Sequence, residues 1–314
     1  MRKMIIKFLK YSAFVFLFFV FSFLFLFFYY AKDLPRPEIF TERELPQSTK
    51  IYDRTGKVLL YEIYGEEKRT YVPISKIPKY LKDAVICAED SNFYHHFGID
   101  PKALVRAILS DLKILKPVYG ASTIPQQLIR STFLSLEKTP ERKLREIILA
   151  IELDRKYSKD QIFEWYLNQI PLGQNAYGVE AASQTYFGKH VWEINLAEAA
   201  TLAALIKAPY LLSPYEENSK EKLLIRKNYI LDKMAREGYI SKEEAEEAKK
   251  QEISFKEKRI EILAPYFVLW IKSMLEEEYG KEFLTTAGWK IYTSLDFEIQ
   301  RIAEEVVREG IEKN

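Results

Sequence analysis

The sequence has little of the residues that build disulfide frameworks and structural metal sites. One cysteine, Cys87, and three histidines occur among 314 residues. A single cysteine cannot form an internal disulfide, and no His/Cys cluster indicates a structural metal. A net charge of only +2, from 47 basic and 45 acidic residues, gives no sign of nucleic-acid binding. Internal repeats are absent too, and we expect Cys87 to be a small core residue.

A long charge-free run stands out near the N-terminus. Residues 11–31 carry no charge and have about the length of a helix that crosses a bilayer. Four basic residues precede this run: Arg2, Lys3, Lys7 and Lys10. The positive-inside rule therefore predicts a cytoplasmic tail at 1–10, a transmembrane anchor at 11–31 and an extracytoplasmic remainder. A cleaved signal peptide is the alternative, but it would end in small residues rather than aromatic ones.

The composition and the spacing of apolar residues divide the remainder of the chain into three parts. Residues 32–49 hold several prolines and no helical period, which is typical of a linker. Residues 50–250 begin with a predicted hairpin and become helical after Pro78, with capping signals at several helix starts. In residues 251–314 a strand-like stretch precedes a charged helix, which suggests a piece of a longer protein.

Two adjacent carboxylates end an otherwise apolar helical pattern at residues 88–98. Leu81, Ala84 and Val85 recur at helical spacing, so Glu89 and Asp90 should leave the last turn before Gly98. Ionisable groups beside apolar residues are costly unless they have a role. A single carboxyl there can act as a general acid or as a general base.

Small and hydroxylic residues dominate a second stretch, residues 120–127. Small residues let a backbone approach a ligand closely, and the stretch offers directional hydrogen bonds of the kind that sugars and phosphates accept. Its candidate binding residues are Ser122, Thr123, Gln126 and Gln127. A cap before a surface helix is the alternative interpretation.

A third stretch begins a helix at Thr139-Pro140. Its apolar positions from Leu144 to Ile151 predict one buried face, with Arg142, Lys143 and Glu146 on the opposite side. Such a trio is commonly a solvated face with weak ion pairs. An adjacent Arg and Lys can also bind a pyrophosphate, with Glu146 orienting a group or holding a metal.

Two further stretches are interpreted as scaffold. Residues 159–169 place Glu164 and Asn168 one turn apart beside a packing stripe, and residues 178–188 combine small residues with an aromatic pair.

Together the five stretches resemble the peptidoglycan glycosyltransferase domain, family 51, of class A penicillin-binding proteins. The first family motif is matched by Glu89, Asp90, Phe93, His96 and Gly98. The second corresponds to residues 120–127, and the third to Arg142, Lys143 and Glu146. The fourth is residues 164–168, with Phe163 in place of the more usual Leu, and the fifth is residues 178–187. Five motifs in order over residues 50–250 are a specific match.

The resemblance implies a mostly α, lysozyme-like fold with a membrane-proximal lobe and small β elements. It implies polymerisation of lipid II into β-1,4 glycan strands with inversion and release of undecaprenyl pyrophosphate. Glu89 would be the general base, supported by Asp90 and His96. Glu146, with Arg142 and Lys143, would stabilise the departing pyrophosphate, with Mg²⁺ or Mn²⁺ as a possible bridge. Expected partners are lipid II, the growing glycan, membrane lipid and cell-wall synthesis proteins.

Two functional alternatives stay open at this point, and one family domain is not evident. A lytic transglycosylase or muramidase would need only one carboxylic acid, but it releases no pyrophosphate for the Arg142–Glu146 cluster to hold. A non-catalytic membrane-anchored scaffold would not need the carboxylates. Ser110–Lys113 and Ser135–Lys138 match the serine transpeptidase motif only by spacing. We interpret residues 251–314 as the start of a linker toward a transpeptidase domain missing from this chain.

Apolar residues around the second motif predict a membrane-dipping lobe. They are Ile114, Leu115, Val118, Phe133 and Leu134.

Overall fold

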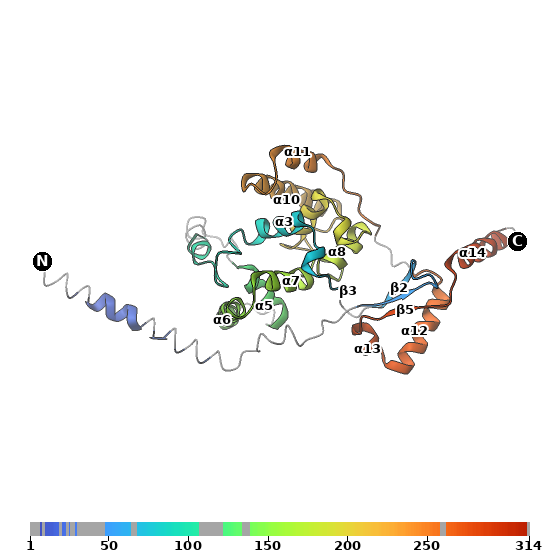
Figure 1. Cartoon of the computed structure of the whole chain (residues 1–314), viewed down its shortest axis with the longest axis horizontal. Helices are drawn as coiled ribbons and strands as arrows, with labels where there is room; N and C mark the ends of the chain where they lie inside the picture. The colour runs from blue at the N-terminus through green and yellow to red at the C-terminus, as the bar shows by residue number, and fades with distance from the viewer. Residues whose placement is uncertain are drawn as a thin grey trace. The chain divides into compact units, whose positions relative to one another are not determined.

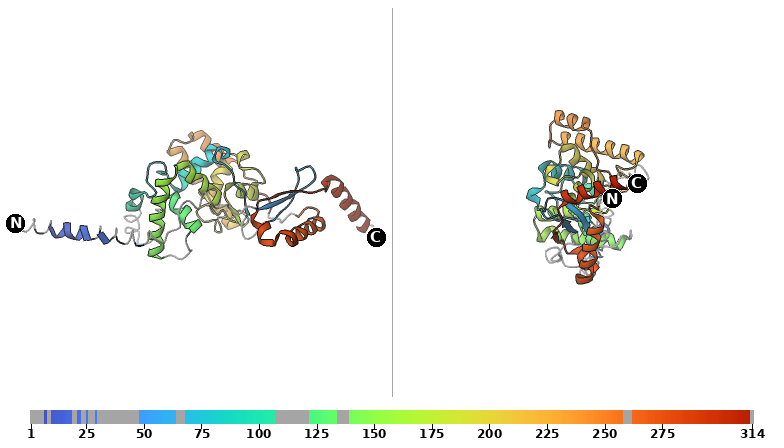
Figure 2. Two further views of the ribbon diagram at one scale, coloured as in Figure 1. Left: turned by 60° about the horizontal axis from the view of Figure 1, so that its bottom comes forward. Right: turned by 90° about the vertical axis from the view of Figure 1, so that its right-hand side faces the viewer.

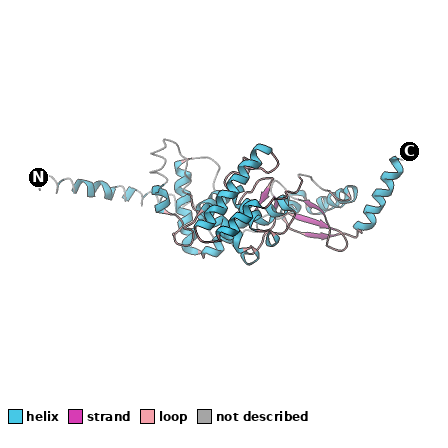
Figure 3. Cartoon of the chain, turned by 90° about the horizontal axis from the view of Figure 1, so that it is seen from above, coloured by secondary structure: helices cyan, strands magenta, loops and turns pink. Residues whose placement is uncertain are grey.

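The protein forms two compact units in a computed structural model. It describes residues 7, 10–18, 21–22, 25, 29, 48–63, 68–106, 122–133, 139–257 and 262–312. Unit 1 comprises Met1–Arg43 and Tyr94–Ile162, and unit 2 comprises Glu44–Phe93 and Phe163–Asn314. Helices predominate over short strands in the described residues, as predicted (Figure 3).

Unit 1 is built on the packing of α5 (Ile124–Phe133) against α6 (Pro140–Lys156). The Thr139 side chain caps α6 by accepting from the Arg142 amide at 3.1 Å, and Pro140 supplies a fixed φ at the first position. A short helix at 101–106 is capped by Asp100, whose Oδ1 accepts from the amides of Lys102 and Ala103. These local signals set where the helices of unit 1 begin.

The core of unit 2 surrounds α9 (Leu196–Leu205), in which every residue after Leu196 is buried. Its alanines let α3 (Lys79–Glu89) and α10 (Glu217–Arg236) pack closely against it. A reciprocal capping box between Asn195 and Glu198 begins the helix. Helix α11 (Lys242–Lys250) covers α10, and the helices lie side by side in Figure 1.

Short elements connect this helical core. Helix α7 (Lys159–Gln169) continues from unit 1 into unit 2. It is followed by β4 (Ala176–Tyr177), which pairs in parallel with β3 (Lys68–Arg69), and by α8 (Val179–Phe187). Two 3₁₀ turns, η1 (Ile74–Lys76) and η2 (Val191–Glu193), complete the connections.

A second sheet in unit 2 joins segments far apart in the sequence. Strand β1 (Thr49–Tyr52) pairs antiparallel with β2 (Leu59–Ile63) and parallel with β5 (Lys290–Tyr292). The antiparallel pair confirms the predicted hairpin. The core of the sheet is completed by α12 (Pro265–Tyr279) and α13 (Lys281–Thr286), which lie beside it in Figure 2. Helix α14 (Phe297–Glu312) follows.

Some sequence expectations fall largely outside the described residues. Parts of the predicted anchor at 11–31 are described, and these are helical. Within the described part of the chain, no helix combines the length and apolar character that membrane crossing requires. Residues 107–121 and 134–138, which include most of the predicted lobe, are not described.

Candidate active site

Glu89 is the last residue of α3, as the sequence predicts. Leu81, Ala84 and Val85 anchor the helix with no exposed surface. The Glu89 side chain is only 12% exposed, and its Oε1 lies 3.3 Å from Nη2 of Arg226 on α10. A largely buried carboxylate is therefore held by a guanidinium that the motif analysis did not identify.

Asp90 lies at the turn that follows α3. It is buried, its amide donates to the Ile86 carbonyl at 2.9 Å, and its carbonyl accepts from the Phe93 amide at 3.0 Å. Phe93 is fully buried against Phe163, with ring centroids 5.5 Å apart. This packing fixes the backbone immediately after Glu89; the supporting role of Asp90 stays a prediction.

The later residues of the first motif belong to unit 1. His96 is buried, and its Nδ1 accepts from the Gly98 amide at 3.1 Å. Gly98 has φ +89°, and a Cβ there would lie 2.3 Å from the Ala150 carbonyl oxygen of α6. Only glycine allows this close backbone approach. The His96 carbonyl accepts from Lys159 Nζ at 2.6 Å. Residues 96–98 therefore contact both Lys159 and the α6 backbone.

Thr123 and Gln126, from the second motif, form the start of α5. The Thr123 amide donates to Gln126 Oε1 at 2.9 Å, and the Thr123 hydroxyl donates to the Gly98 carbonyl at 2.6 Å. The Thr123 hydroxyl also accepts from the Gln126 amide at 3.4 Å, so the two residues cap the helix as the alternative interpretation has it. The helix that they begin is largely buried, however, and not a surface helix. Gln127 lies in the first turn and is partly buried. Gly120 and Ala121 lie outside the described residues.

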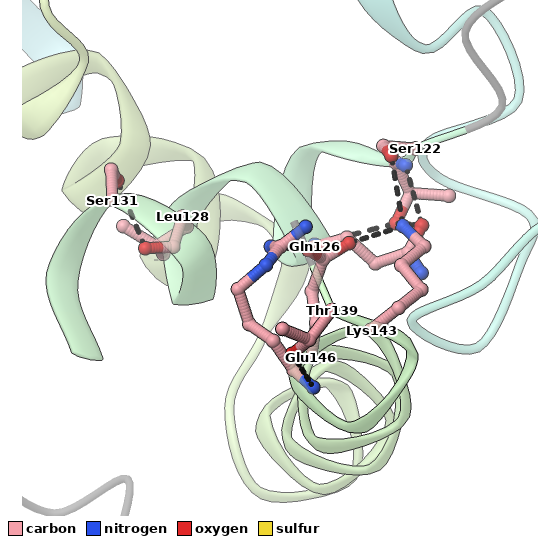
Figure 4. A network of polar contacts seen from close by, with 9 residues as sticks. Ser122, Gln126, Leu128, Ser131, Thr139, Lys143 and Glu146 are labelled. Carbon is pink, nitrogen blue, oxygen red and sulfur yellow. Dashed lines mark hydrogen bonds and ion pairs between the residues drawn. The ribbon is translucent and has the colours of Figure 1, made fainter. Parts of the chain in front are cut away.

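The third motif forms a charged cluster on α6 that also contacts Ser122, just before α5 (Figure 4). Arg142 Nη1 lies 2.9 Å from Glu146 Oε2, while Lys143 Nζ donates to Glu146 Oε1 and, at 3.0 Å, to Ser122 Oγ. Glu146 has no exposed surface, whereas the side chains of Arg142 and Lys143 are 14% and 39% exposed. Two cations thus converge on one buried carboxylate.

The burial of Glu146 corrects the predicted orientation of α6. Of the apolar positions predicted to be buried, Ile148 is buried, whereas Leu144, Ile147 and Ile151 are only partly buried. Glu146, which was predicted on the opposite side, is buried as well. The alternative of a solvated face does not hold for Glu146, which has no exposed surface. Pairing with two cations compensates the desolvation of a carboxylate, which a sequence pattern based on apolar residues does not register.

Arg142 retains donor capacity in this cluster. Its Nε is buried and has no hydrogen-bond partner among the described residues. A buried donor without a partner is costly. The cluster therefore has two positive charges against one negative charge, and one of its donors has no partner among the described residues.

The fourth and fifth motifs support the fold, as predicted. Asn168 has no exposed surface, and its amide group pairs with both the amide and the carbonyl of Val72, at 2.8 and 2.9 Å. Glu164 accepts from the Tyr71 hydroxyl and from the Ile74 amide. Gly178 has φ +82°, and a Cβ there would lie 2.7 Å from the Asn168 carbonyl oxygen. These residues clamp the segment that precedes α3.

Cys87 is a buried free thiol in the structure. Burial, with a contribution from Glu237, raises the pKa of Cys87 to about 12, so its reactive thiolate is scarce near neutral pH. Among the described residues no group of three or more His, Cys, Asp or Glu side chains could hold a metal ion.

Comparison with known families is consistent with the motif pattern. Residues 56–235 match the family described as Transglycosylase. The match extends over more than half of the chain and includes all five motifs. The chain therefore belongs to the transglycosylase family, the family 51 peptidoglycan glycosyltransferases.

Relatives within this family carry the names of penicillin-binding proteins. The chain is 45% identical to penicillin-binding protein 1A of Aquifex aeolicus over 282 residues, which is 90% of this chain and 38% of that protein. Penicillin-binding protein 2D of Bacillus subtilis is 41% identical over 273 residues, 85% of this chain and 39% of that protein. The chain thus spans about two fifths of the length of these curated relatives.

A solved structure also matches, that of penicillin-binding protein 1A from Haemophilus influenzae. It is 28% identical, with a TM-score of 0.46 over 82% of this chain and 28% of that chain.

Proposed function

We propose that this chain polymerises lipid II into β-1,4-linked glycan strands and releases undecaprenyl pyrophosphate. Family membership supports the reaction class. The observation that carries the choice of polymerisation over glycan cleavage is the Arg142, Lys143 and Glu146 cluster, because hydrolysis of finished glycan produces no pyrophosphate to bind.

Glu89 is proposed as the general base. The 4-hydroxyl oxygen of the acceptor sugar attacks the anomeric carbon of the donor, and its proton passes to the Glu89 carboxylate. The bond from the anomeric carbon to the pyrophosphate oxygen breaks, and its electron pair leaves with the pyrophosphate. Attack opposite the leaving group inverts the anomeric configuration. The contact with Arg226 supports this role because it holds the Glu89 carboxylate in a mostly buried position at the end of α3.

Arg142 and Lys143 are proposed to stabilise the departing pyrophosphate. The side chains of Arg142 and Lys143 are 14% and 39% exposed, so that of Lys143 is the more accessible to a ligand. Glu146 holds both cations in place through its two carboxylate oxygens. Preorganised cations of this kind stabilise charge that develops as the leaving group departs.

Mg²⁺ or Mn²⁺ at Glu146 stays a prediction, and no step above depends on it. Both Glu146 oxygens already accept hydrogen bonds from Arg142 and Lys143. The donor set around Glu146 thus fits a cation-stabilised carboxylate better than a direct metal ligand.

We further propose attachment to the cell membrane, with the catalytic part extracytoplasmic. The charge-free run at 11–31 and the basic residues before it support this orientation. A tether raises the effective concentration of the enzyme at a substrate that stays in the membrane plane. Growing glycan, membrane lipid and other cell-wall synthesis proteins are the partners proposed.

The test compares wild type and Glu89→Gln on two substrates. Detergent-solubilised protein is incubated with labelled lipid II and, separately, with finished glycan, and the products are separated by length. We expect chain growth by the wild type and none by Glu89→Gln. Digestion of finished glycan would favour a lytic enzyme, and activity on neither substrate would favour a non-catalytic scaffold.

A further inference from the structure

We propose that Arg226 is a positioning residue that fixes the carboxylate of Glu89 for proton abstraction; this inference rests on the function proposed above. Arg226 lies on α10, outside all five motif stretches. Its Nη2 lies 3.3 Å from Glu89 Oε1, and the two side chains are 18% and 12% exposed. The pair is thus mostly shielded from solvent, where a charge-assisted contact is stronger than at the surface.

The guanidinium of Arg226 contacts two different helices at once. While Nη2 reaches Glu89 at the end of α3, Nε donates to the Ala204 carbonyl of α9 at 3.2 Å. The second contact fixes the plane of the guanidinium, since all five donors of an arginine are held in one rigid group. A lysine has a single point charge and cannot reproduce both contacts in that geometry.

Helix α10 also holds the backbone on either side of Glu89. Lys233, two turns after Arg226, donates to the Cys87 carbonyl and, at 2.9 Å, to Ser91 Oγ. Leu223 and Ile230, one turn before and after Arg226, have no exposed surface and anchor this face of α10. Lys233 therefore fixes the last turn of α3, and Arg226 fixes the side chain that this turn presents.

The contact with Arg226 affects the reaction rate because the glutamate side chain can otherwise rotate away from the proton that it removes. A general base must lie within hydrogen-bond reach of the proton it removes, and small displacements lower the rate steeply. Because Arg226 acts on the base, we expect its loss to lower kcat and leave KM nearly unchanged.

The experiment measures lipid II polymerisation by Arg226→Ala and Arg226→Lys in the full chain. Lys222→Ala is the matched control, because Lys222 is an exposed basic residue on the same helix. Circular dichroism and thermal unfolding verify the fold of each variant. We expect Arg226→Ala to lose about 100-fold in kcat, with KM changed by less than about twofold. Added guanidinium chloride should restore part of kcat, an equal concentration of sodium chloride should not, and Lys222→Ala should match wild type.

Three results would overturn the positioning role. The first is a wild-type kcat in folded Arg226→Ala. The others are a loss of kcat in Arg226→Ala that guanidinium does not relieve, and an equal loss of kcat in Lys222→Ala. If Arg226→Ala does not fold, Arg226→Lys carries the test, and wild-type kcat in that variant overturns the proposal. An inactive wild type, or an active Glu89→Gln, counts against the proposed function instead. An active wild type, an inactive Glu89→Gln and an unimpaired Arg226→Ala refute the positioning role alone.

Discussion

The two carboxylates proposed to act in the reaction, Glu89 and Glu146, combine burial with charge. Each carboxylate is withdrawn from solvent, and each lies against at least one cation. Removing one member of such a pair leaves the other buried and uncompensated. Substitutions at these sites must therefore separate effects on activity from effects on folding.

We predict that Lys143→Ala and Glu146→Gln lose lipid II polymerisation while keeping the fold. Lys143 is partly exposed, and glutamine has the shape of glutamate, so neither change opens a cavity. Loss of preorganised charge at the leaving group should lower kcat about 100-fold. Steady-state kinetics with labelled lipid II and circular dichroism provide the measurements.

Arg145→Ala is the matched control for these two variants, because Arg145 is a basic residue of the same helix that pairs with Glu141 at 2.8 Å. It should retain turnover. Near wild-type turnover in either Lys143→Ala or Glu146→Gln would contradict the pyrophosphate role.

Lys227 provides a pH-dependent prediction for stability. It is buried on α10, and desolvation lowers its pKa from the usual value. Between the lowered pKa of Lys227 in the folded chain and its unfolded pKa of about 10.4, the unfolded chain binds more protons than the folded chain. In that range the contribution of Lys227 to the free energy of unfolding rises with pH. Relative to Lys227→Met, the wild type should gain free energy of unfolding between neutral pH and about pH 10.

Urea unfolding of both proteins at several pH values measures this difference. The exposed Lys222→Met variant should show no such change relative to wild type. A difference between wild type and Lys227→Met that stays constant with pH would refute the linkage.

Among the elements, helix starts are the features that sequence predicts best. Thr139 caps α6 where the sequence predicts a helix start, and the capping signals of the helical part also include Asn195 with Glu198 and Ser241 with Glu244, which begin α9 and α11. These caps are readable from sequence because each depends on residues three apart. The buried side of α6 and the pairing of Arg226 with Glu89 were not predictable in this way. Both depend on residues that contact through the fold, and Arg226 is 137 positions from its partner.

The contact between Gly98 and α6 leads to a prediction about element packing. We expect Gly98→Ala to lower the free energy of unfolding by about 2 to 4 kcal/mol, since φ is positive and the new Cβ would overlap the α6 backbone. Urea unfolding measures the change.

Gly238→Ala separates backbone strain from steric overlap at Gly98. Gly238 has φ +79°, but a Cβ added there would meet nothing within 4 Å, so the substitution should cost only about 1 to 2 kcal/mol from strain. Equal losses in the two variants would show that contact with α6 adds nothing.

For the whole molecule, attachment to the membrane is the property to test. Of the predicted lobe residues, only Phe133 is described, and it is partly buried at the end of α5. Leu104 and Val105, which precede the undescribed stretch, are 46% and 55% exposed. We predict that replacing Ile114, Leu115 and Val118 with Ser weakens vesicle binding by the chain from residue 32 onward, because each buried apolar side chain contributes to membrane affinity.

Vesicle flotation measures this binding. The control replaces Ile225 and Tyr229, exposed residues of α10, with Ser and should leave flotation unchanged. Unchanged flotation of the triple variant would exclude a membrane-dipping lobe at these residues.

The parallel pairing of β1 with β5 has a consequence for biosynthesis. The Lys50 amide donates to the Trp289 carbonyl at 2.7 Å, so β1 reaches its partner only after synthesis has passed Trp289. At typical synthesis rates of about 5 to 20 residues per second, the interval is roughly 12 to 48 s. During that time one edge of β1 has no strand beside it and is open to mispairing with other chains. A nascent chain of this protein is thus most exposed to aggregation before β5 emerges from the ribosome.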